Sequence, residues 1–435
     1  MRWTLPAGNP APHAAPRPFA GARSLRFAVI AALLLASGML PRAAVESGEV
    51  RALWVLRSSL TSPASITSLV RTAHDQGFNT LLVQVRGRGD AYYRSSLEPR
   101  AADLSSEPAS FDPLAAVLTD AHRAGIRVHA WVSLNLISSA VELPASHDHL
   151  VYTHPEWLMV PRPIAQELQH VDPFNPGYVG RISRWTRDEL DTVEGLYASP
   201  LQPGAAAYTR RVIAELVQRY DVDGVHLDYA RFPSAQFDYS RFAIAEFRAD
   251  VRPRIGADLR RTLDAQEVDD LFAYPDALPQ EWAAFRRARL TALVRGIRDA
   301  VRAARPQAIV TAAVVPDPQQ AFDQRLQDWR SWMDAGLVDA ICPMAYAQDP
   351  AKFAEQISAA RAAAGSHAVW AGIGAYRLPP SQTIDDIQTA RKLGAAGIVL
   401  FSYDSLTGPK PPAPDYLATV SRAAFGVAAA DSSSK

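Results

Sequence analysis

The sequence contains one cysteine, no excess of either charge and no hydrophobic segment of comfortable membrane-spanning length. With Cys342 alone, an intramolecular disulfide is excluded, so the fold has to rely on its buried core. The 45 basic and 45 acidic side chains give a formal net charge of zero, which disfavours nucleic acid as a partner because no basic surface is expected. The rest of the composition, 435 residues of which 48% are hydrophobic, is that of a globular protein.

Sequence motifs for common cofactors are also missing. No glycine-rich phosphate loop follows the first apolar run, and no dinucleotide-binding fingerprint occurs. There is no His-x-x-x-His pair with a downstream acid and no cysteine cluster, and the loop sequence His147-Asp148-His149 is weak evidence for a metal by itself. We therefore expect neither a metal nor an organic cofactor. Cys342 lies in a mostly apolar run and is interpreted as a buried small hydrophobe rather than a nucleophile.

The N-terminus differs from the rest of the chain. Residues 1–26 are rich in Pro, Ala and Arg and contain no acid, and 27–40 form an apolar run shorter than the roughly 20 residues of a membrane span. The small residues Ala43-Ala44 follow, which together predicts a secretory signal. The long leader and Arg42 near the expected cleavage site leave an alternative, an uncleaved anchor with transient membrane contact. In both cases we expect export, to the periplasm or the medium.

After the leader, short apolar runs alternate with amphipathic segments. The runs are typical of strands buried on both faces, and the segments between them are typical of helices that connect parallel strands. Glycine follows several helical segments just before the next run, which is a C-cap signal. We expect strands at 50–56, 80–85, 127–132, 224–227, 308–315, 338–344, 368–373 and 397–402. We expect helices at 65–76, 113–124, 206–220, 281–304, 322–335, 351–363, 384–392 and 416–425.

Eight strand–helix units predict an α/β fold, a TIM (β/α)8 barrel. The surplus length falls in three segments after strands two, three and four, which places long insertions at the C-terminal face, where such barrels build their active sites. The alternative, a doubly wound open sheet, is disfavoured because the expected phosphate loop is missing. The domain organisation that we expect is a signal peptide or anchor at 1–44, the barrel at 48–425 and a disordered tail at 426–435.

An acid stands where the fourth expected strand stops. The stretch YDVDGVHLDYARFP (220–233) runs from an apolar strand into Asp228 and then into Tyr229, Arg231 and Phe232. In a barrel this carboxylate lies at the catalytic end of its strand, where it can protonate a leaving group, act as a nucleophile or stabilise positive charge on a sugar ring. The alternative is a structural aspartate that caps the next loop or pairs with Arg231.

The stretch DGVHLDYARFP (223–233) resembles the signature of the bacterial "family 10 glycosylhydrolase"-like proteins, which include peptidoglycan-digesting glucosaminidases. The resemblance covers roughly 48–425. Its implications are a TIM barrel, glycosidase chemistry and a glycan substrate, which we expect to be a bacterial cell-wall or related amino-sugar polysaccharide. Further matching stretches follow in family order, RALWV (51–55), GFNTLLVQVRGRGDAYYRSSLEP (77–99), FDPLAAVLTDAHRAGIRVHAWV (111–132), HPEW (154–157), DPFNPG (172–177) and GIVLFSYDSL (397–406).

The strand-four motif is also loosely similar to that of chitinase-type barrels, with one difference that matters. Their pattern Asp-Gly-x-Asp-x-Asp-x-Glu ends in the catalytic acid, where this chain has Ala230. Substrate-assisted chitinase chemistry is therefore not implied. Tyr346, in PMAY, resembles their Met-x-Tyr element, in which the hydroxyl helps to position the reacting sugar.

A glycosidase needs two carboxyls, and no glutamate lies at an expected strand end. Asp317 is the first choice as partner of Asp228 because strand five neighbours strand four, although Pro-Asp-Pro is also turn chemistry. Asp404, after strand eight, is a further candidate and is more typical of a cap or turn. Asp90 lies between them in rank, beside glycines that allow a ligand to approach the backbone.

Substrate-binding candidates are polar and aromatic residues near the strand ends. Arg86 follows strand two and can hold a sugar oxygen or carboxylate in its fork, or instead pair with Asp90 or Asp228. His226, two residues before Asp228, is more typical of a buried core histidine and is a candidate to orient the acid. Aromatic rings in this position suit the apolar faces of sugars. The full set expected to bind substrate is Arg86, Asp90, Asn135, His226, Tyr229, Arg231, Tyr346, Tyr376 and Tyr403.

Two other functions stay open at this point. A non-catalytic barrel that kept its glycan-binding groove fits the lack of strand-end glutamates. A cytosolic metabolic barrel with a wrongly assigned start fits a chain that retains residues 1–44.

Overall fold

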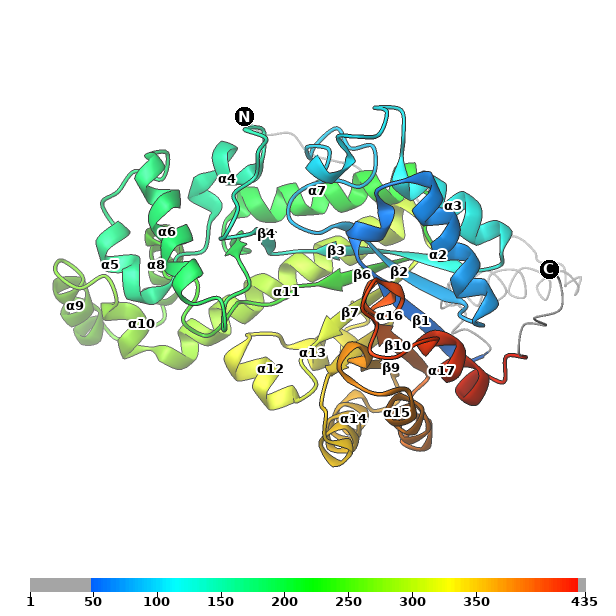
Figure 1. Ribbon diagram of the computed structural model, residues 1–435. Coiled ribbons are helices and arrows are strands. Elements are labelled where there is room, and N and C mark those ends of the chain that lie inside the picture. The colour runs from blue at the N-terminus through cyan, green and yellow to red at the C-terminus, as the bar shows by residue number, and fades with distance from the viewer. Residues whose placement is uncertain (1–47, 429–435) are drawn as a thin grey trace, which may run out of the picture. The chain divides into compact units, whose positions relative to one another are not determined.

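The computed structural model describes residues 48–428. Within this range the eight expected strands form a closed barrel in which all neighbouring strands are parallel, in the order β1-β10-β9-β8-β7-β6-β3-β2 (Figure 1). The predicted TIM barrel is confirmed. The predicted leader and most of the predicted tail lie outside the described residues. The barrel strands are β1 (Val50–Val55), β2 (Thr80–Arg86), β3 (Arg127–Ser133), β6 (Gly224–Asp228), β7 (Ile309–Val314), β8 (Ala340–Ala345), β9 (Ala368–Ile373) and β10 (Gly397–Phe401).

Helices of the outer layer connect these strands, and most of them begin with proline in the first turn, where no backbone donor is lost. The expected helix at 322–335 is wrong in one respect, because the structure breaks it at Leu326, whose φ of 52° is left-handed. Asp328 caps the second piece by accepting the Ser331 backbone N–H at 3.3 Å. The layer comprises α2 (Pro63–Asp75), α3 (Pro113–Arg123), α7 (Pro203–Arg219), α11 (Pro279–Ala304), α12 (Pro318–Gln324), α13 (Trp329–Asp334), α14 (Pro350–Ala364), α15 (Pro380–Lys392) and α17 (Tyr416–Phe425). None of the described helices is both long enough and apolar enough to cross a lipid bilayer.

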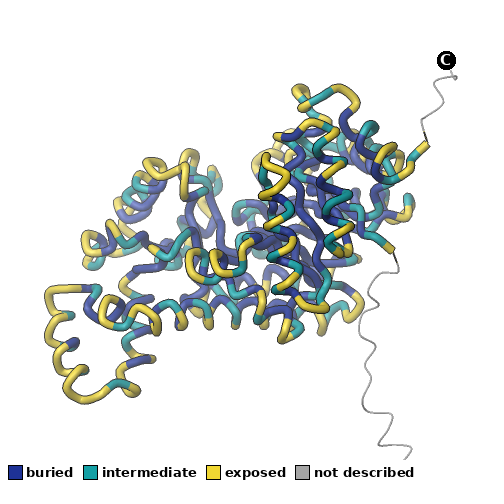
Figure 2. Tube along the Cα trace, turned by 90° about the horizontal axis from the view of Figure 1, so that it is seen from below, coloured by how far each residue is buried: buried dark blue, intermediate teal, exposed yellow. Residues whose placement is uncertain are grey.

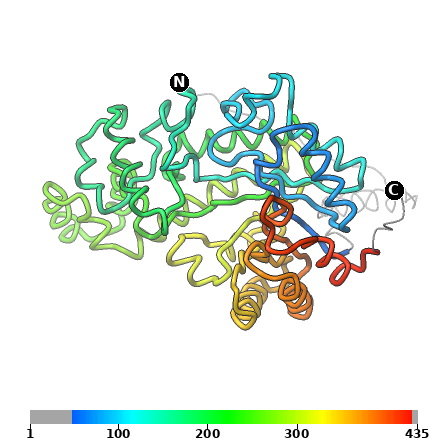
Figure 3. The backbone as a smooth tube through the Cα atoms, in the orientation of Figure 1, coloured from blue at the N-terminus to red at the C-terminus, as the bar shows by residue number. Residues whose placement is uncertain are grey.

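Two insertions extend the chain beyond the barrel, one after β3 and one after β6, and Figure 3 shows them side by side in adjoining shades of green. Buried Asp238 joins them by accepting the Val160 backbone N–H at 2.8 Å, while the Tyr239 N–H donates to the Val160 carbonyl at 2.8 Å. The first insertion contains β4 (Leu136–Ser138), α4 (Leu150–Thr153), η3 (Pro155–Trp157), α5 (Arg162–Leu168), α6 (Pro176–Asp188) and β5 (Leu196–Tyr197). The second contains α8 (Arg241–Val251), α9 (Ala257–Gln266) and α10 (Ala273–Ala277).

Large side chains fill the barrel interior, so the strands are mostly buried while exposed residues gather on the outer faces of the helices and in loops (Figure 2). His226 lies in this interior, where its Nε2 accepts the Trp54 indole N–H at 3.0 Å and its Nδ1 contacts the Thr311 hydroxyl at 2.9 Å. Burial lowers the pKa of His226 to about 3, so the ring is neutral and its proton sits on Nδ1. His226 therefore packs beneath the barrel mouth.

Gly224 in β6 tests how tightly this interior is packed. A Cβ at Gly224 would lie 2.8 Å from the His129 ring, whereas a Cβ at Gly180 on α6 would meet nothing within 4 Å. We expect Gly224→Ala to lower the free energy of unfolding by about 1–3 kcal/mol through overpacking. Gly180→Ala should raise it by roughly 0.5–1 kcal/mol, because alanine favours the helix. Urea denaturation measures both, and equal effects at the two positions would contradict the packing.

Candidate active site

Asp228 is the last residue of β6, and its carboxyl group faces the barrel interior. Its Oδ2 accepts the indole N–H of Trp131 at 3.1 Å, and Trp131 belongs to the buried cluster inside the barrel. Its Oδ1 accepts the Tyr229 backbone N–H at 2.7 Å. The side chain is 9% exposed, so it is nearly enclosed yet open to solvent. Asp228 therefore has the position expected of an acid at the catalytic end of a barrel strand.

Arg231 connects Asp228 with a second acid, Glu194. One guanidinium nitrogen lies 3.8 Å from Asp228 Oδ1 and another donates to Glu194 Oε1 at 3.1 Å. The terminal nitrogens of a guanidinium fork are roughly 2.3 Å apart, so the nearest oxygens of the two carboxyls are separated by no more than about 9 Å. Paired carboxyls in glycosidases span about 5 to 9.5 Å. The geometry therefore allows Asp228 and Glu194 to act on the same bond.

Burial and charge push the pKa values of these two acids in opposite directions. Burial raises the pKa of Asp228 above its ordinary value, although the Arg231 cation and the N–H donors of Tyr229 and Trp131 partly oppose this. Burial also disfavours the charged form of Glu194, but Arg231 and the Tyr197 hydroxyl, which donates to Glu194 Oε2 at 2.6 Å, hold the pKa of Glu194 below its ordinary value. Such a divided pair suits an acid and a base.

Tyr229 and Asn135 shape the surroundings of Arg231. The Tyr229 ring lies under the guanidinium, with 4.5 Å between the guanidinium carbon and the ring centroid. The φ of Tyr229 is 49°, a conformation that non-glycine residues seldom adopt and that is common at functional sites. The Asn135 side-chain amide donates to the Arg231 carbonyl at 3.1 Å. Of the predicted binding residues, the structure therefore brings Tyr229, Arg231 and Asn135 together around Asp228.

Aromatic rings form a second wall. Tyr346 meets Trp54 edge-on at 6.2 Å and Phe401 at 5.5 Å between centroids, and Tyr376 approaches both Tyr346 and Phe401. Burial raises the pKa of the Tyr346 phenol, and the Asp228 charge raises it further, so this hydroxyl stays protonated near the acid. Tyr403, in α16 (Tyr403–Thr407), is mostly buried. Tyr346 and Tyr376 thus line the mouth on which a sugar ring could stack.

Arg86 has another partner than the sequence suggested. Its guanidinium is fully buried and forms an ion pair with Glu98, with Nε at 2.8 Å from Oε1 and 2.9 Å from Oε2. A further nitrogen donates to the Ser133 carbonyl. A buried pair of this kind holds the loop after β2 against the end of β3, and its contacts are those of a structural residue. The expected pairing with Asp90 or Asp228 does not occur in the described residues.

The three other predicted acids make local contacts. Asp317 is exposed and caps α12 by accepting the Gln320 backbone N–H at 2.8 Å. Asp404 accepts the Leu56 backbone N–H at 2.7 Å and the hydroxyls of Ser58 and Ser59, which fixes the loop after β1. Asp90 accepts the Arg88 backbone N–H at 3.1 Å. None of these contacts connects them with Asp228, so a catalytic role for Asp317 or Asp404 remains a prediction.

Glu194 is the residue that the sequence did not identify. It lies in the first insertion, just before β5, whereas the sequence predicts catalytic acids at the ends of barrel strands. β5 pairs antiparallel with β4, which continues from β3, and this pairing carries Glu194 back to the barrel mouth. The only local signal is an acid followed by the short apolar run 195–198, which is too common to identify a site.

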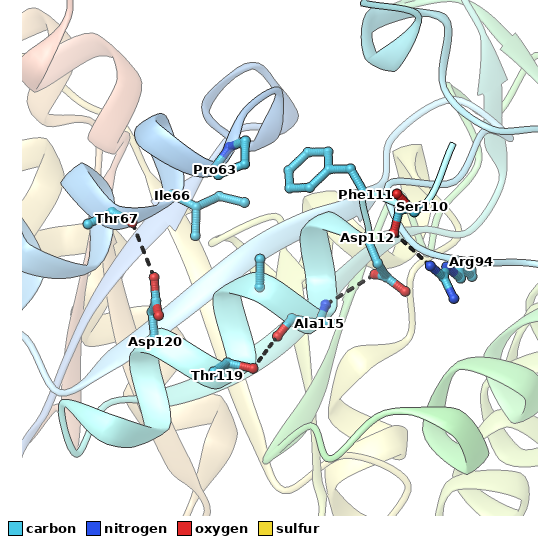
Figure 4. Close-up of a pocket in the computed structure, with 11 residues that line it drawn as sticks. Pro63, Ile66, Thr67, Arg94, Ser110, Phe111, Asp112, Ala115, Thr119 and Asp120 are labelled. Carbon is cyan, nitrogen blue, oxygen red and sulfur yellow. Dashed lines mark hydrogen bonds between the residues drawn. The ribbon is translucent and has the colours of Figure 1, made fainter. Parts of the chain in front are cut away.

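A cavity of about 500 Å³ lies elsewhere, between α2, α3 and the loop that precedes α3 (Figure 4). Thr67 on α2 donates to Asp120 on α3 at 3.3 Å across its floor, and Phe111 and Arg94 border it. None of its lining residues contacts Asp228. Among residues 48–428, no group of three or more His, Cys, Asp or Glu side chains is arranged to hold a metal ion.

The closed parallel barrel, with two acids near the carboxyl ends of its strands, places this protein in the class of TIM barrels, a fold that many glycosidases share. Residues 49–385 match the glycosyl hydrolase-like 10 family, and the chain belongs to that family. The predicted family resemblance is confirmed. Two relatives are the glycosyl hydrolase YngK of Bacillus subtilis (strain 168), 23% identical over 301 residues, and the glycosyl hydrolase DigH of Escherichia coli (strain K12), 25% identical over 287 residues. These matches cover 64% and 62% of this chain but 48% and 55% of the relatives, so the chain spans about half their length.

Solved structures with the same fold include two glycosidase domains. The glycoside hydrolase domain of PgaB (BpsB) from Bordetella bronchiseptica aligns with a TM-score of 0.60 at 15% identity, over 85% of this chain and 97% of that domain. The catalytic domain of beta-amylase from Paenibacillus polymyxa aligns with a TM-score of 0.60 at 12% identity, over 89% of this chain and all of that domain. At these identities the likeness shows the fold alone.

The raised pKa of Asp228 predicts how stability changes with pH. Because the folded state holds this proton more tightly than the unfolded state, Asp228 costs stability as pH rises above the ordinary aspartate pKa towards the raised folded value. We expect Asp228→Asn, which mimics the protonated acid, to be more stable than the wild type near pH 7, with a gain that shrinks towards about pH 4. Urea denaturation at both pH values measures this gain.

Asp299→Asn on the exposed face of α11 controls for loss of a negative charge. A gain at Asp228 that is the same at both pH values, or a loss that deepens at neutral pH, would contradict the burial argument.

Proposed function

We propose that this protein is an exported glycoside hydrolase that cleaves a bacterial cell-wall or related amino-sugar polysaccharide. Asp228 donates a proton to the leaving oxygen, and Glu194 acts as the base or nucleophile on the other side of the sugar. The observation that carries the proposal is the Asp228–Arg231–Glu194 arrangement at the strand ends, with its two carboxyls of opposed pKa.

The surroundings of Arg231 support a ligand at this place. The residue is 7% exposed, and its Nε and one terminal nitrogen have no hydrogen-bond acceptor among the described residues. Buried donors of this kind usually find a partner, because an unmade hydrogen bond is costly. A sugar hydroxyl or a water that attacks the sugar would satisfy the nitrogen that faces Asp228. The Tyr346 hydroxyl, whose pKa burial and the Asp228 charge raise, is a second polar group that a sugar at this place could contact.

The choice of substrate and of cellular location comes from other observations. The cell-wall or amino-sugar substrate rests on the motif resemblance, and the family supports a glycan in general. Export to the periplasm or the medium rests on the basic and apolar pattern of residues 1–44, and the same pattern carries the proposed transient membrane contact.

Asp228→Asn tests the catalytic role most simply. We expect the release of reducing ends from peptide-free cell-wall glycan to fall by at least about a hundredfold, because the variant lacks the transferable proton. Binding of the same glycan should persist, because the amide keeps the shape of the carboxyl group. Glu194→Gln should cause a loss of similar size, whereas Asp317→Asn should keep full activity if its carboxylate only caps α12.

Other results would identify a different second carboxyl or a non-catalytic protein. If Asp317→Asn removes activity while Glu194→Gln retains it, the second carboxyl is the one favoured by strand order. A wild-type chain that binds cell-wall glycan but releases no reducing ends, like Asp228→Asn, would make the protein a non-catalytic glycan-binding barrel.

A further inference from the structure

Among the arginines at the same barrel end as Asp228, Arg57 and Arg88 form no ion pair with an acid of the described residues. Arg57 opens the short helix η1 (Arg57–Leu60), which follows β1, and Arg88 follows β2. Because β1 and β2 are parallel neighbours, both residues lie at the C-terminal face, where a barrel builds its binding site. The mechanism proposed above uses neither of them.

Arg57 reaches over the mouth. One of its terminal nitrogens donates to Gln84 Oε1 at 3.2 Å, and Gln84 is the register partner of Trp131, whose indole donates to Asp228. A Cβ at Gly87 would lie 2.7 Å from the same nitrogen, so glycine there leaves room for the guanidinium. The contacts of Asp404 with the backbone and hydroxyls of the loop after β1 hold Arg57 in this place.

Arg88 lies beside both Arg57 and the residue that follows the acid. Its charge interacts with that of Arg57 and with Tyr229. Its backbone carbonyl accepts the His149 Nε2–H at 2.7 Å, which anchors the loop. Partial burial, together with the Arg57 charge, lowers the pKa of Arg88. The guanidinium groups of Arg57 and Arg88 therefore repel each other, and that of Arg88 is partly buried.

No carboxylate of the described residues forms an ion pair with either guanidinium, although Asp90, which accepts the Arg88 backbone N–H, and Asp103 partly oppose the lowering of the Arg88 pKa. Arg86 and Arg231 differ, because Arg86 is paired with Glu98 and Arg231 with Glu194. A pair of cations that the protein itself does not neutralise is suited to an anion brought by the ligand.

We propose that Arg57 and Arg88 form a subsite that selects glycans with a carboxylate on a sugar close to the cleaved bond. This inference rests on the proposed glycosidase function and narrows its substrate to acidic sugars. The carboxylate has two chemical sources, the C6 acid of a uronic acid and the lactyl ether acid of a muramic acid. Both offer two oxygens to a guanidinium fork, whereas a neutral hexose or N-acetylhexosamine leaves the two cations unneutralised.

Binding to the Asp228→Asn chain tests the subsite without turnover. The probes are two matched pairs: tetragalacturonate with its carboxyl-reduced form, and a peptide-free N-acetylglucosamine–N-acetylmuramic acid tetrasaccharide with its carboxyl-reduced form. We expect at least a tenfold lower Kd for the acid form in one pair, and the pair that shows it identifies the source of the carboxylate. The preference should weaken as salt is raised, because the site is partly exposed.

Substitutions assign the preference to the two arginines. Arg57→Gln with Arg88→Gln should reduce it below about threefold while the affinity for the reduced forms changes little, because only the charge-assisted contacts are lost. Gly87→Ala, which keeps both charges but displaces Arg57, should also reduce it. Arg71→Gln, on the exposed face of α2, is the matched control and should keep the full preference.

Equal affinity for the acid and reduced forms in both pairs, or no measurable binding of any of the four, overturns the subsite. Retention of the preference in the double variant overturns it as well. A chain that hydrolyses neutral chitooligosaccharides but shows no acid preference remains a glycosidase without this subsite. A chain with the preference but no turnover of any probe keeps the subsite and loses the glycosidase function.

Discussion

The guanidinium of Arg231 is the interaction on which the rest of the site depends. It stands between Asp228 and Glu194 and favours ionisation of both, yet the two acids respond differently because their burial differs. Asp228 is 9% exposed and packs against an indole, so desolvation prevails and it tends to hold its proton. Glu194 is 36% exposed and accepts a hydrogen bond from the Tyr197 hydroxyl, so its pKa is lowered and the charged form is favoured. Because the two carboxyls differ in burial, the same cation leaves Asp228 suited to be the acid and Glu194 suited to be the base.

The barrel and its first insertion contribute different halves of this arrangement. Strand ends supply Asp228 and Trp131, held from below by the neutral His226 and its hydrogen bonds to Trp54 and Thr311. The insertion supplies Glu194, which returns to the mouth because β5 pairs with β4. Buried Asp238 joins the two insertions through backbone donors, so the loops that carry the second acid are packed rather than free. A barrel without the first insertion would keep Asp228 and lose Glu194.

The fold could be predicted well from the sequence because barrel strands and their helices carry local signals, namely apolar runs, proline starts and glycine stops. Asp228 was predictable for the same reason, since its place follows from the end of β6. Glu194 was not, because its position depends on an antiparallel pairing within an insertion that no local pattern reveals. The ion-pair partner of Arg86 could not be predicted for the same reason, because Glu98 comes from an irregular loop. Contacts that depend on the course of long loops cannot be predicted from sequence periodicity.

The most direct test of the paired-acid account is the crystal structure of the Asp228→Asn chain with a bound cell-wall oligosaccharide. The account predicts a glycosidic oxygen within hydrogen-bond distance of the residue 228 side chain, with the Glu194 carboxylate near the anomeric carbon of the same sugar. A sugar bound in the cavity between α2 and α3, or one at the mouth with neither side chain near its glycosidic bond, would contradict it.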